Sequence, residues 1–334
     1  MLVAFQRRII YMGYSPIGAR QELLRDIDTL GPFDVRKISA DVSPKVRLDG
    51  LEVCRKSAGD NNKPSILFYL QGNAGNPLSR LPVFHKLLHD KACVDDLKII
   101  AFAPSSYWTS SRRRPTQRKL LEDYRCALQK TRERYPESPI FIYGHSLGGA
   151  ISTILLAEHL HDENINGLIL ENAFGSIPDM IKAYFISPRI PYWHLHRLAF
   201  DKWDAKSVAH KVKAKTLILI SENDELVPRA HVLQYESVAN VVLLESIESS
   251  VNVLLIQVEH LNSWLDGVSS AEFQHLVVFE SMNSKVKALS RDRNSPSSDK
   301  TTTDFVLSSE EREVAVGFEL AEVNTEWNDN TAWL

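Results

Sequence analysis

Short apolar runs alternate along the chain with amphipathic stretches, a pattern typical of a sheet whose strands are connected by helices. Four runs are predicted to be buried strands: 65–70, 138–143, 167–170 and 215–220. Residues 149–158 form a longer apolar stretch, which predicts a buried helix. This alternation predicts an α/β fold with a mostly parallel central sheet flanked by helices.

Changes in composition suggest how the chain is organised. Residues 1–64 lead into the sheet with early edge strands, and the alternation of strands and helices follows them. Between about 172 and 213, proline and aromatic residues interrupt it, which predicts a small lid insertion after strand 6 or, alternatively, an apolar insert that only packs on the sheet. Residues 281–334 are rich in Ser, Thr, Asp, Glu and Asn. We therefore expect a domain over 1–280 and a polar, disordered tail over 281–334.

One serine lies between two glycines where the predicted strand 138–143 meets the predicted helix. The sequence is Gly144-His145-Ser146-Leu147-Gly148. A serine on such a sharp turn is held out at the end of the sheet, and side chains at the glycine positions would collide with the strand and the helix. The motif predicts a nucleophile elbow with Ser146 as the nucleophile; an ordinary glycine turn is the alternative.

A serine nucleophile needs a histidine base, which a carboxylate orients. Asp224 follows the predicted strand 215–220, at the carboxyl end where parallel sheets keep their chemistry, and it is the predicted acid. Glu222 and Glu225 in the same loop, and Glu171 at the end of another predicted strand, are alternatives.

The predicted base is His260. It follows the apolar run 251–258, which is predicted to be the last strand. A second apolar run at 241–244 leaves the position of that strand open. The chain has eleven histidines, and most of the others lie in helix-like stretches or in the aromatic insert.

Acyl transfer also requires two N–H donors for the negatively charged oxygen of the intermediate. The backbone of Leu147, at the start of the helix after the elbow, is one predicted donor. Asn73, in the glycine-containing loop after strand 65–70, is the other. This loop lacks the full G-x-G-x-x-G spacing, which excludes a dinucleotide site.

On these residues the chain resembles the α/β-hydrolase superfamily, and within it the group of α/β-hydrolase domain-containing proteins 13 and 17 and their fungal relatives. The resemblance covers roughly residues 1–268 and rests on the segments 5–11, 72–76, 144–149, 224–228 and 260–264. It implies a serine hydrolase in which Ser146 is the nucleophile, Asp224 the acid, His260 the base, and Asn73 and Leu147 the oxyanion donors.

The chain departs from the family pattern in three places. Gln71 stands where the family usually has a histidine, and residues 103–115 replace a tyrosine- and glycine-rich turn. The approach to His260 lacks the usual glycine. Within the replaced turn, three successive arginines at 112–114 indicate a solvated loop or, alternatively, a contact for an acidic substrate group.

The composition is typical of a globular enzyme. The 334 residues are 44% hydrophobic and 24% charged, enough for one large core, and the net charge of −3 argues against a nucleic-acid surface. Three scattered cysteines argue against a disulfide framework or a metal cluster and favour a reducing compartment. The apolar start, residues 1–5, is too short for a signal peptide or a membrane span. We expect an intracellular protein, cytoplasmic or membrane-associated.

The predicted function is that of a serine hydrolase that cleaves an ester or thioester through a Ser146 acyl-enzyme. An amide is a weaker candidate. We expect a small-molecule or lipid-like acyl ester as substrate, no metal or organic cofactor, and no nucleic-acid partner. Peripheral membrane association and the oligomeric state stay open. The alternative is a non-catalytic α/β-hydrolase-fold protein that binds a partner or organises membranes, with a degraded histidine region.

Overall fold

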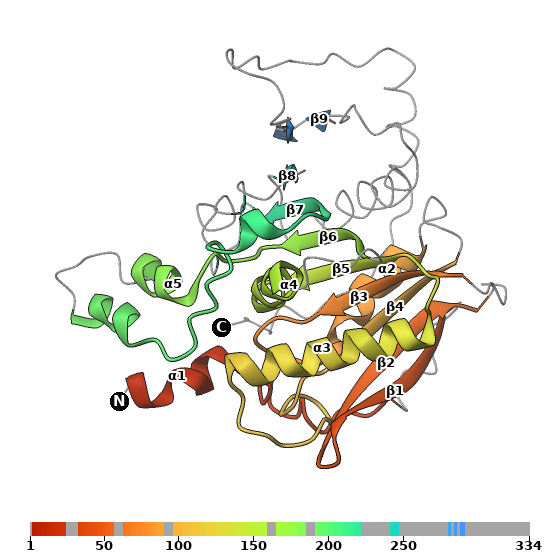
Figure 1. The fold of residues 1–334 in the computed structure, drawn as a ribbon, viewed down its shortest axis with the longest axis horizontal. Coiled ribbons are helices and arrows are strands. Elements are labelled where there is room, and N and C mark those ends of the chain that lie inside the picture. The colour runs from red at the N-terminus through yellow and green to blue at the C-terminus, as the bar shows by residue number, and fades with distance from the viewer. Residues whose placement is uncertain are drawn as a thin grey trace, which may run out of the picture. The chain divides into compact units, whose positions relative to one another are not determined.

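A sheet of nine strands forms the core of the computed structural model (Figure 1). The strand order is β1-β2-β4-β3-β5-β6-β7-β8-β11. Strands β3 to β8 run parallel to one another, whereas β1, β2 and β11 pair with their neighbours in antiparallel fashion. The predicted α/β fold with a mostly parallel sheet is therefore confirmed.

The structure describes residues 2–24, 33–56, 63–89, 96–158, 165–184, 191–221, 227, 235, 241–246, 280–281, 284–285 and 288–290. All of them belong to the first of two units into which the chain divides, residues 1–292 and 293–334. The predicted boundary between 280 and 281 stays a prediction.

The strands of the main sheet are β1 (Phe33–Ser43), β2 (Val46–Arg55), β3 (Ser65–Leu70), β4 (Leu97–Phe102), β5 (Ile140–His145), β6 (Ile165–Glu171), β7 (Lys215–Ser221), β8 (Val241–Ser246) and β11 (Ala288–Ser290). Strands β9 (Glu280–Ser281) and β10 (Ser284–Lys285) form a separate pair. The helices are α1 (Leu2–Ile10), η2 (Pro77–Arg80), α2 (Leu81–His89), α3 (Gln117–Arg134), α4 (Leu147–Glu158), α5 (Ile177–Tyr184), η3 (Pro191–Leu198) and η4 (Ala209–Lys211).

The central strands form where the sequence has uninterrupted apolar runs. In β3, residues 66–70 are at most 1% exposed. A strand buried on both faces has no polar side to present, so its sequence is continuously apolar rather than alternating. The four runs predicted as strands overlap β3, β5, β6 and β7, and these predictions are confirmed.

Helices α3 and α4 cover the same face of the sheet, in front of it in Figure 1. Helix α3 is capped by Thr116, the residue before it, whose side chain accepts a hydrogen bond from the Lys119 N–H at 3.3 Å. Such a cap satisfies one of the free amide groups at a helix start. Helix α4 is buried from Leu147 to Ala157 because it is apolar on all sides, as predicted.

The segment between β6 and β7 interrupts the alternation of strands and helices, as the sequence predicted. It contains α5, η3 and η4, and Figure 1 shows α5 and η3 on the same side of the sheet as α1. Helix α1 contacts this insert directly: Gln6 exchanges hydrogen bonds with the backbone of Leu198 and Phe200, and Arg7 pairs with Asp201 at 2.7 Å. The role of the insert as a lid stays a prediction.

The carboxyl-terminal edge of the sheet is described only in part. The run at 241–244, the alternative to 251–258, lies in β8, which is parallel to β7. Residues 251–258 lie outside the described residues. Part of the predicted disordered tail forms β10 and β11, and β11 pairs with β8. The apolar residues Ala288 and Leu289 lie in β11. Its pairing with β8 satisfies backbone hydrogen-bonding groups on that edge of β8.

Candidate active site

Ser146 occupies a tight turn between β5 and α4. Its φ angle is +52°, a left-handed conformation that costs a residue with a side chain about 1–2 kcal/mol. The turn is held from both sides, because the Ser146 N–H donates to the Glu171 carbonyl at 2.8 Å and the Ser146 carbonyl accepts from the Gly149 N–H at 2.9 Å. The strand–turn–helix context that was predicted for this serine is therefore present.

The two glycines of the motif allow this turn to close. A methyl group on Gly144 would lie 2.6 Å from the Gly148 carbonyl oxygen. A methyl group on Gly148 would overlap the Leu70 carbonyl oxygen and lie 2.8 Å from that of Gln71. All these obstacles are backbone atoms, which cannot rotate away.

We therefore expect Gly148→Ala to lower the free energy of unfolding by about 3 kcal/mol, the upper end of the usual cost of overpacking. Urea unfolding followed by circular dichroism measures this change. Gly18→Ala is the control without a steric obstacle, since an added methyl there would meet nothing within 4 Å, and its cost is that of an alanine at a φ of +93°, about 1–2 kcal/mol. Equal losses in the two variants would contradict a steric role for Gly148.

The loop after β3 lies directly against the turn. A methyl group on Gly72 would lie 3.0 Å from His145 Nδ1 and 3.6 Å from Ser146 Cβ. The next residue in this loop is Asn73, and Leu147 is the first residue of α4. Within the described residues, neither the Asn73 nor the Leu147 backbone N–H donates a hydrogen bond to another backbone group. The structure thus brings Ser146, Leu147 and the loop that carries Asn73 together.

A buried ion pair lies beside the turn. The Glu171 carboxylate accepts hydrogen bonds from Arg80 at 2.6 Å and from the Tyr143 hydroxyl at 2.9 Å. Burial raises the pKa of Glu171, but the charges of Arg80 and His145 and the hydrogen bonds from Tyr143 and Arg80 together outweigh it and hold that pKa below its usual range. His145 of β5 is paired with Glu171 of β6, and Tyr143 lies two residues before His145, so the three side chains share one face of the sheet.

His145 is uncharged at neutral pH. Burial and the neighbouring Arg80 lower its pKa from 6.5 to about 4, although Glu171 acts in the opposite direction. The imidazole of His145 therefore binds a proton more tightly in the unfolded chain, where its pKa is 6.5, than in the folded one. Folding stability that depends on His145 therefore decreases as the pH falls from 6.5 towards 4.

We predict that His145→Gln loses less stability than wild type when the pH is lowered from 7 to 5, because the variant has no imidazole to protonate. Urea unfolding at both pH values provides the measurement. His210→Gln is the control, since His210 is exposed on η4. Parallel pH dependences of His145→Gln and wild type would refute the prediction.

The predicted acid and base, Asp224 and His260, lie outside the described residues. Strand β7 ends at Ser221, three positions before Asp224, and it is hydrogen-bonded to β6, which ends at Glu171. The alternative acid Glu171 is described, and its carboxylate is already engaged by Arg80 and Tyr143. The alternatives Glu222 and Glu225 lie outside the described residues as well.

The three successive arginines have different environments. Arg113 is held between two carboxylates, Glu122 at 3.0 Å and the fully buried Asp123 at 2.5 Å. Arg112 and Arg114 are exposed. The middle arginine thus supports the loop before α3, and only its two neighbours face solvent.

Among the described residues, no group of three or more His, Cys, Asp and Glu side chains is arranged to hold a metal ion. Cys54 and Cys126 are free and partly buried, and burial raises the pKa of both thiols. Neither is therefore an activated nucleophile. In the same part of the chain, no helix combines the length and the apolar character needed to cross a bilayer.

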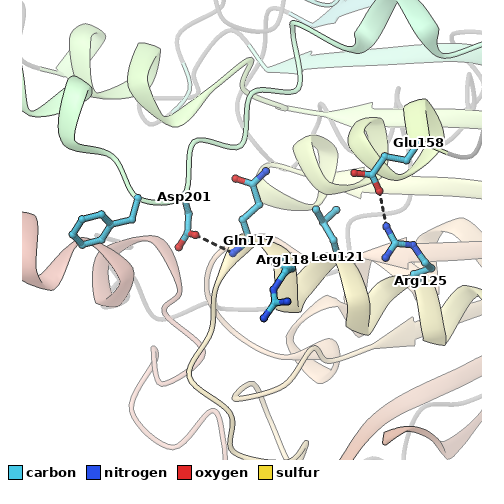
Figure 2. A pocket seen from close by; sticks show the side chains of 7 residues that line it. Gln117, Arg118, Leu121, Arg125, Glu158 and Asp201 are labelled. Carbon is cyan, nitrogen blue, oxygen red and sulfur yellow. Dashed lines mark hydrogen bonds and ion pairs between the residues drawn. The ribbon is translucent and has the colours of Figure 1, made fainter.

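A surface cavity of about 340 Å³ is lined by residues of α3, the end of α4 and the segment after η3 (Figure 2). Figure 2 shows Arg125 reaching Glu158 and Asp201 reaching the start of α3 at Gln117. Glu158 is the last residue of α4, about 17 Å along the helix from Leu147 at 1.5 Å per residue. Ser146 is not among the residues that line this cavity.

Comparisons with known proteins agree with this arrangement. A family model described as serine aminopeptidase, S33, matches residues 110–203. Protein bem46 of Schizosaccharomyces pombe is 30% identical over 237 residues, which are 68% of this chain and 72% of bem46. The α/β-hydrolase domain-containing protein WAV2 of Arabidopsis thaliana is 29% identical over 248 residues, 69% of this chain and 74% of WAV2.

A solved structure extends the similarity to the fold. The Pyrococcus furiosus esterase Pf2001 superimposes with a TM-score of 0.54 and 18% identity, over 74% of this chain and 93% of the esterase. The sheet order, the turn at Ser146 and the extent of the similarity to bem46 lead to one conclusion: the chain belongs to the α/β-hydrolase family.

Proposed function

We propose that this hydrolase cleaves a carboxylic ester or thioester through an acyl-enzyme on Ser146. The observation that carries the proposal is the left-handed turn at Ser146, with φ +52°, next to two backbone N–H groups that have no backbone acceptor among the described residues. A strained serine beside free amide donors is the arrangement that acyl transfer requires.

His260 is the proposed base. In acylation, Ser146 Oγ bonds to the substrate carbonyl carbon and gives its proton to His260, while Asn73 and Leu147 N–H groups bind the resulting oxyanion. The bond to the leaving alcohol or thiol then breaks, and the leaving group takes the proton from His260. Deacylation follows the same steps with water as the nucleophile. Water gives a proton to His260, its oxygen bonds to the acyl carbon, and Ser146 leaves with that proton.

Asp224 is the proposed acid, which orients His260 and stabilises its charged form. Its place in the sequence supports this role, because it follows β7 and the carboxyl ends of parallel strands lie at one edge of the sheet. The engagement of Glu171 by Arg80 and Tyr143 is a further argument, since a carboxylate neutralised by an ion pair is a poor partner for an imidazolium.

The proposed substrates are small-molecule esters or lipid-like acyl esters. The similarity in fold to a protein named as an esterase supports an ester, and apolar side chains exposed near the insert are compatible with an acyl chain. These side chains lie on α1, at the last residue of η3 and just after it, and they are 45–56% exposed: Phe5, Ile9, Leu198 and Phe200. We include peripheral membrane association in this proposal, because such a surface can enter the bilayer interface.

Turnover of p-nitrophenyl acetate and longer-chain p-nitrophenyl esters tests the proposal. We expect His260→Ala and Asp224→Asn each to lower kcat by about 10⁴-fold. Glu222→Gln is the matched control in the same loop and should leave kcat near the wild-type value. A larger loss in Glu222→Gln than in Asp224→Asn would overturn the assignment of the acid.

If folded wild-type protein turns over none of these esters, the non-catalytic alternative, a binding or membrane-organising module, becomes the better account. If it is active, the dependence of kcat/KM on chain length reports the size of the acyl pocket. A preference for long chains would favour lipid-like substrates, and a preference for acetate would favour small ones.

A further inference from the structure

Tyr107 reaches the loop that carries the proposed oxyanion donor Asn73. Tyr107 lies in the loop between β4 and α3, and its side chain is 1% exposed. Its hydroxyl donates a hydrogen bond to the Asn73 carbonyl oxygen at 3.0 Å. The Met12 N–H donates to the same oxygen at 2.7 Å. Two segments far apart in the sequence thus hold a single carbonyl of this loop.

The segment after α1 lies closely on the Tyr107 ring. A methyl group on Gly13 would be 2.7 Å from Tyr107 Cγ, so only a glycine permits this approach. The segment also reaches the far end of the loop, where the Gly75 N–H donates to the Ser15 carbonyl at 2.7 Å. The Asn73 loop is therefore enclosed between the N-terminal segment and Tyr107.

The backbone on both sides of Tyr107 is strained. Ser106 and Trp108 have φ angles of +72° and +39°, values that residues with side chains rarely adopt. Both are fixed by hydrogen bonds: the Ser106 N–H donates to the Ser111 carbonyl and the Trp108 Nε1–H to the Glu22 carbonyl, each at 2.9 Å. Strain of this kind persists where the surrounding structure imposes it, and it concentrates at functional sites.

The Tyr107 hydroxyl is a permanent donor at neutral pH. Burial raises the pKa of Tyr107 well above its ordinary value, so the proton stays on the phenol oxygen. A donor that does not ionise can hold a carbonyl at every pH at which the enzyme works.

From this geometry we infer that Tyr107 is a positioning residue for the oxyanion site. Its hydrogen bond fixes the Asn73 carbonyl and so restricts the Asn73 backbone, which sets the direction of the Asn73 N–H. This inference rests on the proposed function. Tyr107 contacts the loop rather than the substrate, so it acts through Asn73. Donors of this kind accelerate acyl transfer only when they are aligned before the charge develops.

Tyr107→Phe tests the inference, because it keeps the ring against Gly13 and removes one hydrogen bond. Asn73 keeps its bond from Met12, so the loss should be smaller than the 10²–10³-fold loss of a whole donor. We expect kcat for p-nitrophenyl acetate to fall about tenfold while KM changes less than about twofold.

A second readout distinguishes alignment from general weakening. Oxyanion donors bind a negatively charged oxygen better than the larger sulfur of a thionoester. The ratio of kcat/KM for p-nitrophenyl acetate to that for the matching thionoester should therefore fall in Tyr107→Phe, because a misaligned donor discriminates less between oxygen and sulfur.

Tyr135→Phe is the matched control. The Tyr135 hydroxyl donates to Glu52 at 2.8 Å. Tyr135 follows α3 and precedes the amino end of β5, whereas the Asn73 loop follows the carboxyl end of β3, so the two lie at opposite ends of the parallel strands. Thermal unfolding of each protein is measured first, and all assays are run well below the lowest midpoint, so that every variant is folded.

An active wild type with unchanged kcat and ester ratio in Tyr107→Phe would overturn this inference alone. Equal losses in Tyr135→Phe would overturn it too, because they would indicate general destabilisation. A folded wild type that hydrolyses neither ester would instead overturn the proposed function.

Discussion

Ser146→Ala is expected to reduce the hydrolysis of p-nitrophenyl acetate by about 10⁴- to 10⁶-fold, the range typical of losing a catalytic nucleophile. The substitution removes only Oγ, which no described residue contacts through a hydrogen bond, and alanine adopts the left-handed conformation about as readily as serine. The thermal unfolding midpoint should therefore stay close to that of wild type. Initial rates measured at saturating substrate give the comparison.

Ser207→Ala is the control for this prediction. Ser207 is exposed, and its hydroxyl donates to the Asp204 carbonyl in the segment that precedes η4. This variant should retain the wild-type rate. If Ser146→Ala retained it as well, another group would have to be the nucleophile, and the turn at Ser146 would have a purely structural explanation.

Glu171→Gln is expected to lower the free energy of unfolding by about 3–5 kcal/mol. The amide can still accept from Tyr143, but the Arg80 guanidinium, 2.6 Å from the carboxylate, then lies partly buried without a counter-charge. Removing one partner of such a pair is costly because the remaining charge stays away from water. Urea unfolding at pH 7 measures the loss.

A double-mutant cycle tests the cause of this loss. Arg80→Met combined with Glu171→Gln removes both charges, so we expect the double variant to be more stable than the sum of the single changes predicts. Strict additivity would contradict an ion-pair explanation. The pH supplies a second check: the pKa of Glu171 is below its usual value of 4.5, so its stabilisation is present above that pH and is lost as the pH falls below it.

The strands of the fold were predictable where burial on both faces makes the sequence continuously apolar. The predicted runs 65–70 and 215–220 lie within β3 and β7. Strand pairing was harder to predict at the carboxyl-terminal edge of the sheet. Two apolar runs follow β7, and periodicity alone could not decide which of them forms the next strand. The structure forms β8 from the nearer run, as Val241–Ser246. Pairing with β7 is a long-range property that a local pattern does not encode.

The nucleophile turn was predictable because the spacing of its two glycines around Ser146 marks the positions at which a side chain would collide with the strand or the helix. Arg80 and Tyr107 were not predicted, since their roles depend on partners about 91 and 34 positions away in the chain. One signal was available: Tyr143 and His145 alternate on β5 and precede the elbow, which places two polar side chains on one face of a buried strand. A buried strand with polar residues on one face needs polar partners there.

The role of Ser146 as the nucleophile is tested most directly by covalent labelling of the wild-type protein with a fluorophosphonate, followed by mass spectrometry of the peptides. Such a probe reacts with an activated serine and mimics the tetrahedral intermediate. We expect a single modified residue, Ser146, and loss of labelling in His260→Ala. Folded protein that is not labelled, or is labelled at another residue, would contradict the claim that Ser146 is the catalytic nucleophile.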